Sequence, residues 1–340
     1  MAHGNAPGGA LGPVPFADAG FGDAVQDHRV KEYAGAVVPG LPTNPKLRLC
    51  CYQGTWVRDR WVPGIMAMQR SFTPRRGGDV VLASPPKCGT TWLKALAFAT
   101  MARGAYPPAH ADHPLLRLNP HDCVPFMEDL FADGWGSKVE ALPSPRLMAT
   151  HVHYSLLPAS CVGNNPDCKI VYICREPKDM LVSMWHFMTK TFQPGLSFSD
   201  FFEGACGGVC VSGPVWDHVL GYWNASKTSP ETILFLRYED ILRDPVVNLR
   251  KLAQFLGQPF SAAEEAAGVV TDIVKLCSFD KLKHLDVNRT GGQSSIPVRN
   301  DAYFRKGEAG DWANHMTQEM ARRLDAIVEE KLRGSGLSFA

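Results

Sequence analysis

The sequence predicts an α/β fold: a single domain with a central parallel β-sheet flanked by helices. Two observations lead to this prediction. After residue 45, short apolar runs alternate with helical stretches, which is how a parallel sheet covered by helices appears in a sequence. The 340 residues, 45% hydrophobic and 20% charged, can bury one large core, and no internal repeat or linker divides the part after residue 45.

Residues 1–45 differ from the rest of the chain. They are rich in Gly, Ala and Pro and show little apolar periodicity. Such a segment cannot repay the entropy of its ordering by burying apolar surface. We therefore expect a mostly disordered N-terminal tail over residues 1–45 and a folded domain over residues 46–340.

Four apolar runs of strand length are the expected central strands. They are Asp79–Ser84, Arg146–His151, Lys169–Arg175 and Ile233–Tyr238. The expected helices run from Thr91 to about Ala102, from Pro177 to about Thr189, from Pro245 to Leu256 and from Thr317 to Arg333. Glycine follows the last two, at positions 257 and 334, where a helix C-terminus favours a left-handed residue.

Charge and composition restrict the location and the partners. The formal net charge of +1 provides no field that would attract nucleic acid or a membrane, so any anion site must be local. No run of eighteen apolar residues occurs, and the first twenty-five residues lack the basic start and apolar core of a signal peptide. We expect a soluble, cytoplasmic protein with no nucleic acid and no membrane as partner.

The ten cysteines are scattered through the chain. A chain of this length without a secretion signal needs no disulfide framework, so we expect reduced thiols. Cys206 and Cys210 are four residues apart, but no second pair with ligand spacing follows them. A zinc site is therefore the less favoured interpretation, and we expect no metal.

A turn between an expected strand and an expected helix carries Lys87, Gly89, Thr90 and Thr91 in the stretch SPPKCGTTWLK. The N–H groups at a helix start are unpaired, and glycine allows an oxyanion to approach closely, so the turn favours a phosphate. The common nucleoside triphosphate motif has its lysine directly after the last glycine, whereas Lys87 precedes Gly89 by two positions. We expect the lysine to contact a bridging or leaving oxygen; an ordinary turn with a solvent-exposed lysine is the alternative.

Two further segments carry cations. Arg175 ends a strand, where open α/β sheets bind ligands, and Ser183 lies eight residues on in the next helix. Arg305, Lys306 and Gly307 lie in a loop before the last helix and form a second clamp for phosphate. The alternatives are an arginine that caps its own sheet and a basic surface loop. Three such segments in a nearly neutral protein indicate a ligand with more than one phosphate.

The motifs PKCGTTWLK, YICREPKDMLVSMWHF and RKGEAGDW resemble, in order and spacing, the three donor-binding motifs of the cytosolic sulfotransferases. The plant members are the most similar, through YQGTWV, NPHDCVPFMED, ATHVHYSLLP, GPVWDHVLGYW and CSFDKLKHLDVN. The resemblance spans Tyr52 to Phe339. It implies a P-loop-kinase-like sulfotransferase fold and transfer of the sulfuryl group of 3′-phosphoadenosine 5′-phosphosulfate (PAPS) to a hydroxyl of a small plant metabolite or hormone. The other product would be adenosine 3′,5′-bisphosphate (PAP).

The resemblance also implies residue roles. His151 would be the general base and Lys87 would stabilise the leaving 5′-phosphate. The other donor contacts would be Cys88, Gly89, Thr90 and Thr91 at the 5′-phosphate, Trp92, Tyr238 and Phe279 at the adenine, and Arg175, Ser183, Arg305, Lys306 and Gly307 at the 3′-phosphate. In-line transfer needs a base near the acceptor hydroxyl and positive charge where the leaving oxygen gains electrons, and histidine and lysine supply both at neutral pH.

The acceptor contacts implied by the resemblance are Tyr52, Trp56, His121, Phe126, His153, Tyr154 and Trp223. Aromatic walls with few polar groups suit a flat or fused-ring hydroxylated molecule, and core packing is the alternative for each residue. The resemblance covers acceptors such as flavonols, hydroxyjasmonates, steroids, desulfo-glucosinolates and strigolactone precursors, and the sequence does not choose among them.

The chain departs from the family at three places. His153 stands where plant members usually have proline, and Cys88 stands where a small hydroxyl residue or alanine is common. Ala313 replaces the lysine of the family's dimer motif, so we expect a monomer or a weak homodimer.

Two other functional classes remain as alternatives. A magnesium-dependent small-molecule kinase should have its lysine after the glycines and a strand-end aspartate for the metal. A catalytically silent binding protein should lack Lys87 or His151. The sequence matches neither pattern.

Overall fold

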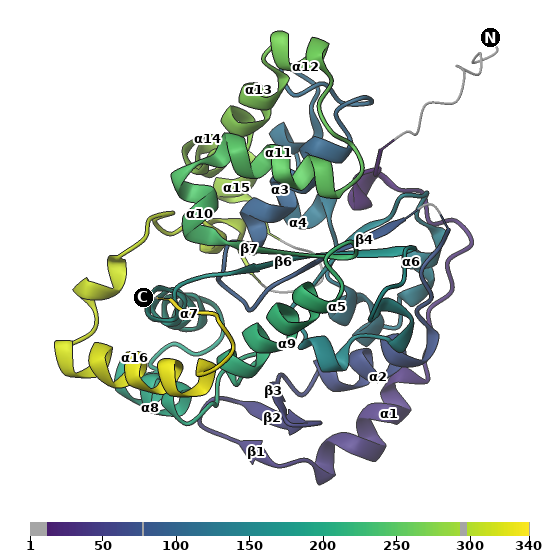
Figure 1. Ribbon diagram of the computed structural model, residues 1–340. Helices are drawn as coiled ribbons and strands as arrows, with labels where there is room; N and C mark the ends of the chain where they lie inside the picture. Colours follow the sequence, from purple (N-terminus) through teal and green to yellow (C-terminus); the bar gives the residue numbers. More distant parts are fainter. Residues whose placement is uncertain (1–11, 77, 293–297, 340) are drawn as a thin grey trace.

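The computed structural model describes residues 12–76, 78–292 and 298–339, and its centre is a four-stranded sheet (Figure 1). The strands are all parallel and lie in the order β5-β4-β6-β7. They are β4 (Asp79–Ala83), β5 (Leu147–Thr150), β6 (Cys168–Cys174) and β7 (Ile233–Arg237). The four predicted central strands and the α/β fold class are confirmed.

The helices cover both faces of the sheet. They are α1 (Val30–Val37), α2 (Trp61–Ser71), α3 (Thr90–Met101), α4 (Pro120–Cys123), α5 (Met127–Ala132), α6 (Gly136–Ala141), α7 (Pro177–Thr191), α8 (Phe198–Cys206), α9 (Val215–Thr228), α10 (Tyr238–Arg243), α11 (Pro245–Phe255), α12 (Ala262–Ala266), α13 (Val269–Leu276), α14 (Phe279–His284), α15 (Asp286–Thr290) and α16 (Gln318–Leu332). Four of them, α3, α7, α11 and α16, are the four predicted helices.

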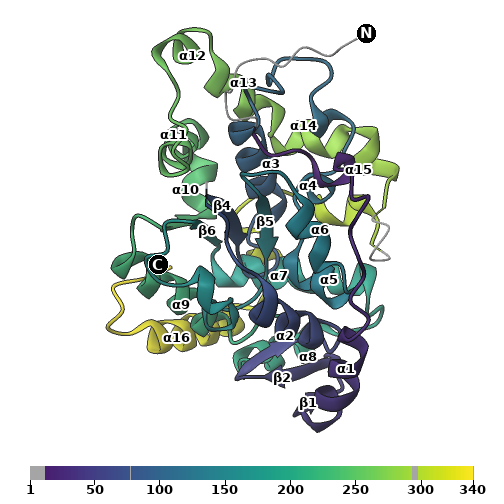
Figure 2. The same ribbon diagram turned by 90° about the vertical axis from the view of Figure 1, so that its right-hand side faces the viewer.

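Two apolar cores lie on the two sides of the sheet because side chains of a strand alternate between its faces. Val81 and Ala83 of β4 belong to one core, and Val80 and Leu82 belong to the other. Figures 1 and 2 show α3, α11 and α13 on one side of the sheet and α5, α7 and α9 on the other. All residues of β4 are buried, which is typical of a central parallel strand.

A second sheet was not predicted. It is small and antiparallel, with β1 (Thr43–Asn44), β2 (Leu49–Tyr52) and β3 (Thr55–Val57) in that order. Gln53 and Gly54 connect β2 to β3 with φ angles of 48° and 79°. Both angles are left-handed, as a two-residue hairpin turn requires, so the glycine in YQGTW was the available signal.

The described part of the N-terminal segment is ordered, which corrects our expectation for residues 12–45. It contains α1 and β1, and Val30 of α1 is buried. Upstream of α1, the Asp27 N–H donates to the Gly134 carbonyl (2.8 Å) and the Gln26 side chain donates to the Asp133 carbonyl (2.8 Å). These long-range bonds order a stretch that has no apolar periodicity of its own. Residues 1–11 and residue 340 of the predicted segments lie outside the described residues.

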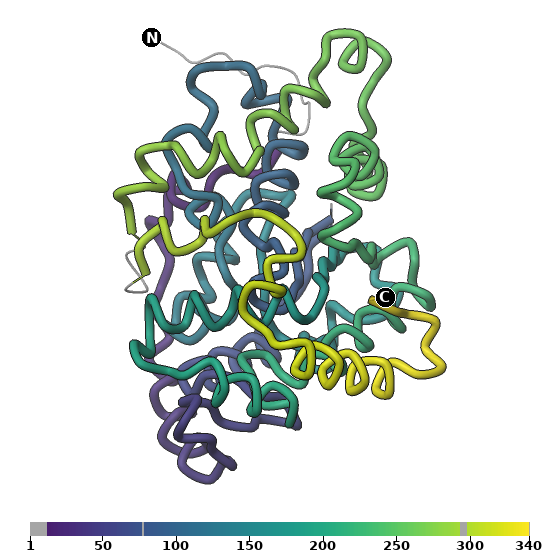
Figure 3. The backbone as a smooth tube through the Cα atoms, turned by 90° about the vertical axis from the view of Figure 1, so that its left-hand side faces the viewer, coloured from purple at the N-terminus to yellow at the C-terminus, as the bar shows by residue number. Residues whose placement is uncertain are grey.

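The carboxyl ends of the parallel strands meet at one edge of the sheet. Ala83 at the end of β4 pairs with Thr150 of β5, and Cys174 at the end of β6 pairs with Arg237 of β7. The residues that follow these strands are therefore brought to the same edge. Figure 3 shows the yellow-green segment that leads into α16 crossing the middle of one side of the molecule.

Candidate functional site

A cavity of about 320 Å³ lies at this edge. Fifteen of the residues selected from the sequence line it: Lys87, Gly89, Thr90, Thr91, Trp92, His121, Phe126, His151, Arg175, Ser183, Tyr238, Phe279, Arg305, Lys306 and Gly307. They come from the ends of all four central strands, from α3, α4, α7 and α14, from the start of α5, and from the segment before α16. The three cationic segments that are far apart in the sequence thus share one cavity.

The turn after β4 has the geometry of an anion site. Gly89 caps α3 with φ of 98°, and a Cβ at this position would lie 2.7 Å from the Tyr238 ring. Only glycine fits here, and the first N–H groups of α3 are left for a ligand. Lys87 itself has a left-handed φ of 70°, and its Nζ lies 4.3 Å from the centre of the Phe187 ring.

Lys87 lies in an environment that disfavours its charge. Burial, and then the positive charges of Arg175 and Arg305, lower the pKa of Lys87 to about 7. A bound anion would offset the influence of Arg175 and Arg305 on the pKa of Lys87, because it would place negative charge among these cations. The shifted pKa therefore supports the assignment of this end of the cavity to an anionic ligand.

Arg175 follows β6 and is almost fully buried. Its Nη2 donates to the Glu308 carbonyl at 2.5 Å, and its guanidinium lies 4.6 Å from the centre of the Tyr238 ring. Its Nε has no hydrogen-bond partner within the described residues. Because a buried donor without a partner is costly, this N–H is available for a ligand in the cavity.

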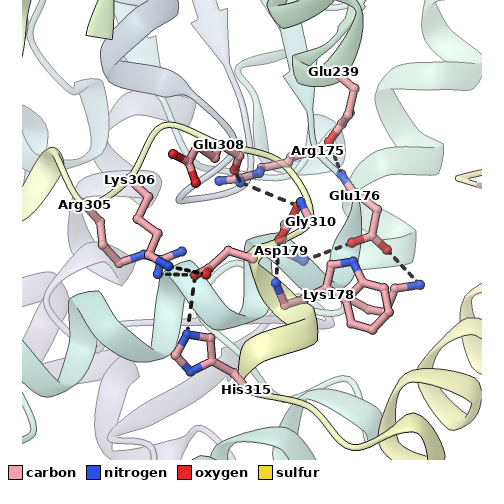
Figure 4. A network of polar contacts seen from close by, with 12 residues as sticks. Arg175, Glu176, Lys178, Asp179, Glu239, Arg305, Lys306, Glu308, Gly310 and His315 are labelled. Atoms are coloured by element: carbon pink, nitrogen blue, oxygen red, sulfur yellow. Dashed lines mark hydrogen bonds and ion pairs between the residues drawn. The ribbon is translucent and has the colours of Figure 1, made fainter. Parts of the chain in front are cut away.

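Acidic side chains hold the loop that carries Arg305 and Lys306. Both cations donate to Asp311. Figure 4 shows Arg305 and Lys306 side by side. Burial raises the pKa of Asp311, but the hydrogen bonds from Lys306 and Arg305 outweigh it and hold this pKa well below its usual range. Asp179 of α7 accepts from the Gly310 N–H at 2.6 Å and so anchors the loop to the helix that follows Arg175.

Aromatic rings form the wall between these cations. Trp92 and Tyr238 meet edge to face, with ring centres 5.7 Å apart. Gly307 has φ of 74°, and a Cβ there would lie 2.5 Å from the Phe279 ring. The ring therefore packs directly on the loop backbone, and a flat ligand could stack among these side chains.

His151 follows β5 and is held as a neutral base. Its Nδ1 lies 2.9 Å from the Ser84 carbonyl oxygen, so we assign the proton to Nδ1, which leaves the lone pair of Nε2 free. The backbone N–H of His151 donates to Glu128 at 2.8 Å, which fixes the end of the strand. Burial, with smaller contributions from nearby cations such as Lys94, lowers the pKa of His151 to about 3.

A chain of hydrogen bonds links Lys94 through His121 to Thr91, at the turn after β4. The Lys94 Nζ donates to His121 Nδ1 at 2.9 Å and to the Val124 carbonyl at 2.7 Å. Because Nδ1 accepts, Nε2 carries the proton and donates to the Thr91 hydroxyl oxygen, 3.0 Å away. The hydroxyl proton of Thr91 is then left to donate to a ligand. Lys94 was not selected from the sequence, because its role depends on where α4 lies.

One end of the cavity was largely missed by the sequence reasoning. Its additional lining residues are Arg58, Trp61, Asp129, Phe187, Phe192 and Tyr303. Trp61 lies at the start of α2, and its ring centre is 6.2 Å from that of His151. Arg58 directly follows YQGTWV, and Asp129 and Phe187 are the last residues of NPHDCVPFMED and YICREPKDMLVSMWHF, so these three had a signal, whereas Trp61, Phe192 and Tyr303 lie outside the quoted motifs.

Six of the selected residues do not line the cavity. Tyr52 and Trp56 belong to the hairpin β2–β3, and Cys88 is buried. The Tyr154 hydroxyl accepts from the Gly163 N–H at 3.0 Å, and the Trp223 Nε1 donates to the Ser335 carbonyl at 2.9 Å. His153 is buried, and its Nε2 donates to the Ser212 carbonyl at 3.0 Å. These side chains serve packing and local hydrogen bonds.

All ten cysteines are free, as predicted. Within residues 12–76, 78–292 and 298–339, no group of three or more His, Cys, Asp or Glu side chains is arranged to hold a metal ion. No helix in the same residues is long and apolar enough to cross a membrane.

Comparisons with known proteins give one family. Residues 77–336 match the model of the sulfotransferase domain. Cytosolic sulfotransferase 5 of Arabidopsis thaliana is 43% identical over 318 residues, which cover 91% of this chain and 97% of the relative. Flavonol 3-sulfotransferase of Flaveria bidentis is 43% identical over 292 residues, with 84% and 91% covered. The crystal structure of a mouse sulfotransferase complexed with PAP superimposes with a TM-score of 0.65 at 27% identity and covers 85% of this chain and 96% of that one.

Proposed function

The chain belongs to the sulfotransferase family, and on that premise we propose that it transfers the sulfuryl group of PAPS to a hydroxyl of a small acceptor. One observation supports this proposal above the others. The cationic turn after β4, the cations of the loop 305–307 and the free Nε2 of His151 line a single cavity.

The donor-binding residues fit a nucleotide with two separate phosphate groups. Lys87 and the start of α3 would hold the 5′-phosphate, through the N–H groups of Cys88, Gly89, Thr90 and Thr91. Arg175, Ser183, Arg305, Lys306 and Gly307 would hold the 3′-phosphate, and Trp92, Tyr238 and Phe279 would pack against the adenine. The Nε atoms of Arg175 and Arg305, which have no hydrogen-bond partner in the described part of the chain, agree with this, because each would gain an acceptor. The mouse structure with PAP supports the choice of nucleotide.

The reaction would use two residues of this chain directly. Bound PAPS supplies a sulfuryl group on a phosphate leaving group. His151 Nε2 would take the proton of the acceptor hydroxyl as the new sulfur–oxygen bond forms. Lys87 would stabilise the negative charge that develops on the 5′-phosphate as its bond to sulfur breaks. The Thr91 hydroxyl would also donate a hydrogen bond to the 5′-phosphate, because its oxygen accepts from His121 and its own proton stays available.

The acceptor end of the cavity is aromatic. Trp61, Phe126, Phe187, Phe192 and Tyr303 line it. Such walls suit a flat hydroxylated molecule, and one relative is named as a flavonol 3-sulfotransferase. We propose a plant secondary metabolite or hormone as the acceptor. Location in the cytoplasm, as the name of another relative implies for that protein, stays a prediction.

The test is transfer of label from ³⁵S-labelled PAPS to a panel of phenols, hydroxylated hormones and terpenoid lactone precursors, with a chelator present. We expect a labelled product, and Lys87→Met should lower its rate by about tenfold or more because the leaving charge loses its cation. PAP binding is measured separately by calorimetry. A protein that binds PAP but transfers label to no acceptor would be the catalytically silent binding protein. Transfer of phosphate from ATP with magnesium, and none from PAPS, would contradict the proposal.

A further inference from the structure

Arg58 is a cation at the acceptor end of the cavity. It directly follows β3, and its carbonyl accepts from the Trp61 N–H at 2.9 Å, so the chain turns into α2 at this point. Its guanidinium carbon lies 3.9 Å from the centre of the Phe192 ring and 5.5 Å from that of Trp61. The two aromatic rings hold the guanidinium in the cavity wall.

The N–H groups of Arg58 have no hydrogen-bond acceptor among the residues that the structure describes. Within the described residues, no carboxylate, carbonyl or hydroxyl oxygen forms a hydrogen bond or an ion pair with its guanidinium. Contact with an aromatic ring uses the face of the guanidinium and leaves its five in-plane N–H donors free. A charge in a wall of low polarity is costly unless it is paired.

Asp129 lines the same cavity, and its charge raises the pKa of Arg58 by less than burial lowers it. Asp129 accepts from the Trp61 Nε1 at 2.9 Å and lies 3.4 Å from the guanidinium of Arg60. Arg60 also pairs with Asp133 at 3.4 Å, whereas Arg58, two residues earlier, forms no ion pair with any residue that the structure describes. Of these two neighbouring arginines, Arg60 is therefore paired with carboxylates and Arg58 is available for a ligand.

The position of Arg58 relates it to the acceptor rather than to the donor. The Trp61 ring is close to both groups: its centre lies 5.5 Å from the guanidinium carbon of Arg58 and 6.2 Å from the centre of the His151 ring. The cations proposed to bind the donor belong to other elements: the turn after β4, the end of β6 and the loop 305–307. Arg58, Trp61 and His151 line the same cavity, so an acceptor that packs against Trp61 could reach both His151 and Arg58.

We propose that the acceptor is a hydroxylated organic acid, whose carboxylate pairs with Arg58 while its hydroxyl faces His151. A carboxylate matches the fork of a guanidinium and can accept two parallel N–H bonds from it. The inference rests on the proposed sulfuryl transfer and narrows its acceptor from hydroxylated molecules in general to those that also carry a carboxylate.

The experiment compares hydroxyphenyl- and hydroxynaphthyl-alkanoic acids with their methyl esters. Binding of each pair to the PAP-loaded protein is measured by tryptophan fluorescence, and label transfer from ³⁵S-PAPS is measured in parallel. We expect at least one acid to bind about tenfold or more tightly than its ester, as a charge-assisted bidentate pair provides. Arg58→Met should abolish this difference, mainly by lowering the affinity for the acid.

Arg70→Met is the matched control, because the guanidinium of Arg70 also lies on an aromatic ring, 4.5 Å from the centre of Tyr33, but outside the cavity. It should keep the preference for the acid. Equal binding of acid and ester throughout the set, or a preference that survives in Arg58→Met, would overturn the proposal. So would an Arg58→Met protein whose PAP binding is weakened as much as its acid binding, because Arg58 would then serve the donor. A preference without any label transfer would instead contradict the proposed function alone.

Discussion

At the scale of single residues, the protonation states of Lys87 and His151 decide what the cavity can do. Lys87 has a pKa lowered to about 7 and His151 one lowered to about 3, in both cases mainly by burial. Near neutral pH the histidine is therefore a free base, while the lysine in the free protein is only partly charged. Ligand binding must complete the charge of the lysine.

Proton uptake on binding follows from the lowered pKa of Lys87. Anionic PAP favours the charged lysine and raises its pKa, so above pH 7 binding must take up a proton and the affinity must fall as the pH rises. Calorimetry at pH 8 in two buffers of different ionisation enthalpy measures this uptake. Lys87→Met should bind PAP more weakly and lose most of the uptake. Equal uptake in the parent and the variant would show that another group titrates.

The two histidines after β5 should behave differently. His151→Ala should lower kcat by about a hundredfold or more, because a general base contributes at least that much, and should leave PAP affinity within a few-fold. His153→Gln retains a donor for the Ser212 carbonyl, and His153 does not line the cavity, so its kcat should stay within a few-fold of the parent. Steady-state rates with ³⁵S-PAPS decide between them. A larger loss in His153→Gln would mean that the base is His153.

At the scale of elements, the start of α3 requires a residue without a side chain. Gly89→Ala combines a left-handed φ of 98° with a Cβ only 2.7 Å from the Tyr238 ring. We expect PAP affinity to fall by about tenfold or more, because either the ring or the turn that holds the phosphate must move.

Gly268 provides the control for this variant. It caps α13 with a φ of 78°, and nothing lies within 4 Å of the position of its Cβ. Gly268→Ala should show the backbone strain, about 1–2 kcal/mol in the free energy of unfolding, with unchanged PAP affinity. Equal PAP affinities for the two variants would contradict a close fit of Tyr238 on the turn.

At the scale of the whole molecule, the cavity joins segments that are more than two hundred residues apart. Arg305 and Lys306 reach the turn of Lys87 only because Asp179 and Asp311 hold their loop. The backbone N–H groups of residues 305–309 donate no hydrogen bond to any other described residue. This loop therefore depends on its side-chain contacts and on a ligand.

Hydrogen exchange should report this dependence. We expect amide exchange in residues 305–309 to slow markedly on PAP binding, because a phosphate gives these N–H groups acceptors. Exchange in the hairpin of residues 49–57, which contributes no donor contact, should change little beyond the general stabilisation by a ligand, about 2.7 kcal/mol at a hundredfold excess over Kd. The opposite pattern would place PAP elsewhere.

Much of the fold and the donor end of the cavity followed from the sequence, because their signals are local. Buried parallel strands are short apolar runs, and Gly89 and Gly307 mark backbone positions that only glycine occupies without strain. The rule for open α/β sheets then predicted a ligand contact for Arg175, at the end of β6.

The sequence by itself thus determined the α/β class, the central strands and the cationic turns. Only the tertiary structure decided that residues 12–45 are ordered, which groups Lys94 contacts, and that Arg58 lies in the wall of the cavity at its acceptor end. These depend on contacts between elements with no periodic pattern: a backbone bond from Asp27 to Gly134, a lysine that reaches α4, and an arginine that lies on a ring of Phe192. Tyr154 and Trp223 resemble acceptor contacts in sequence but pack away from the cavity, because an aromatic residue type fits a core and a binding site equally well.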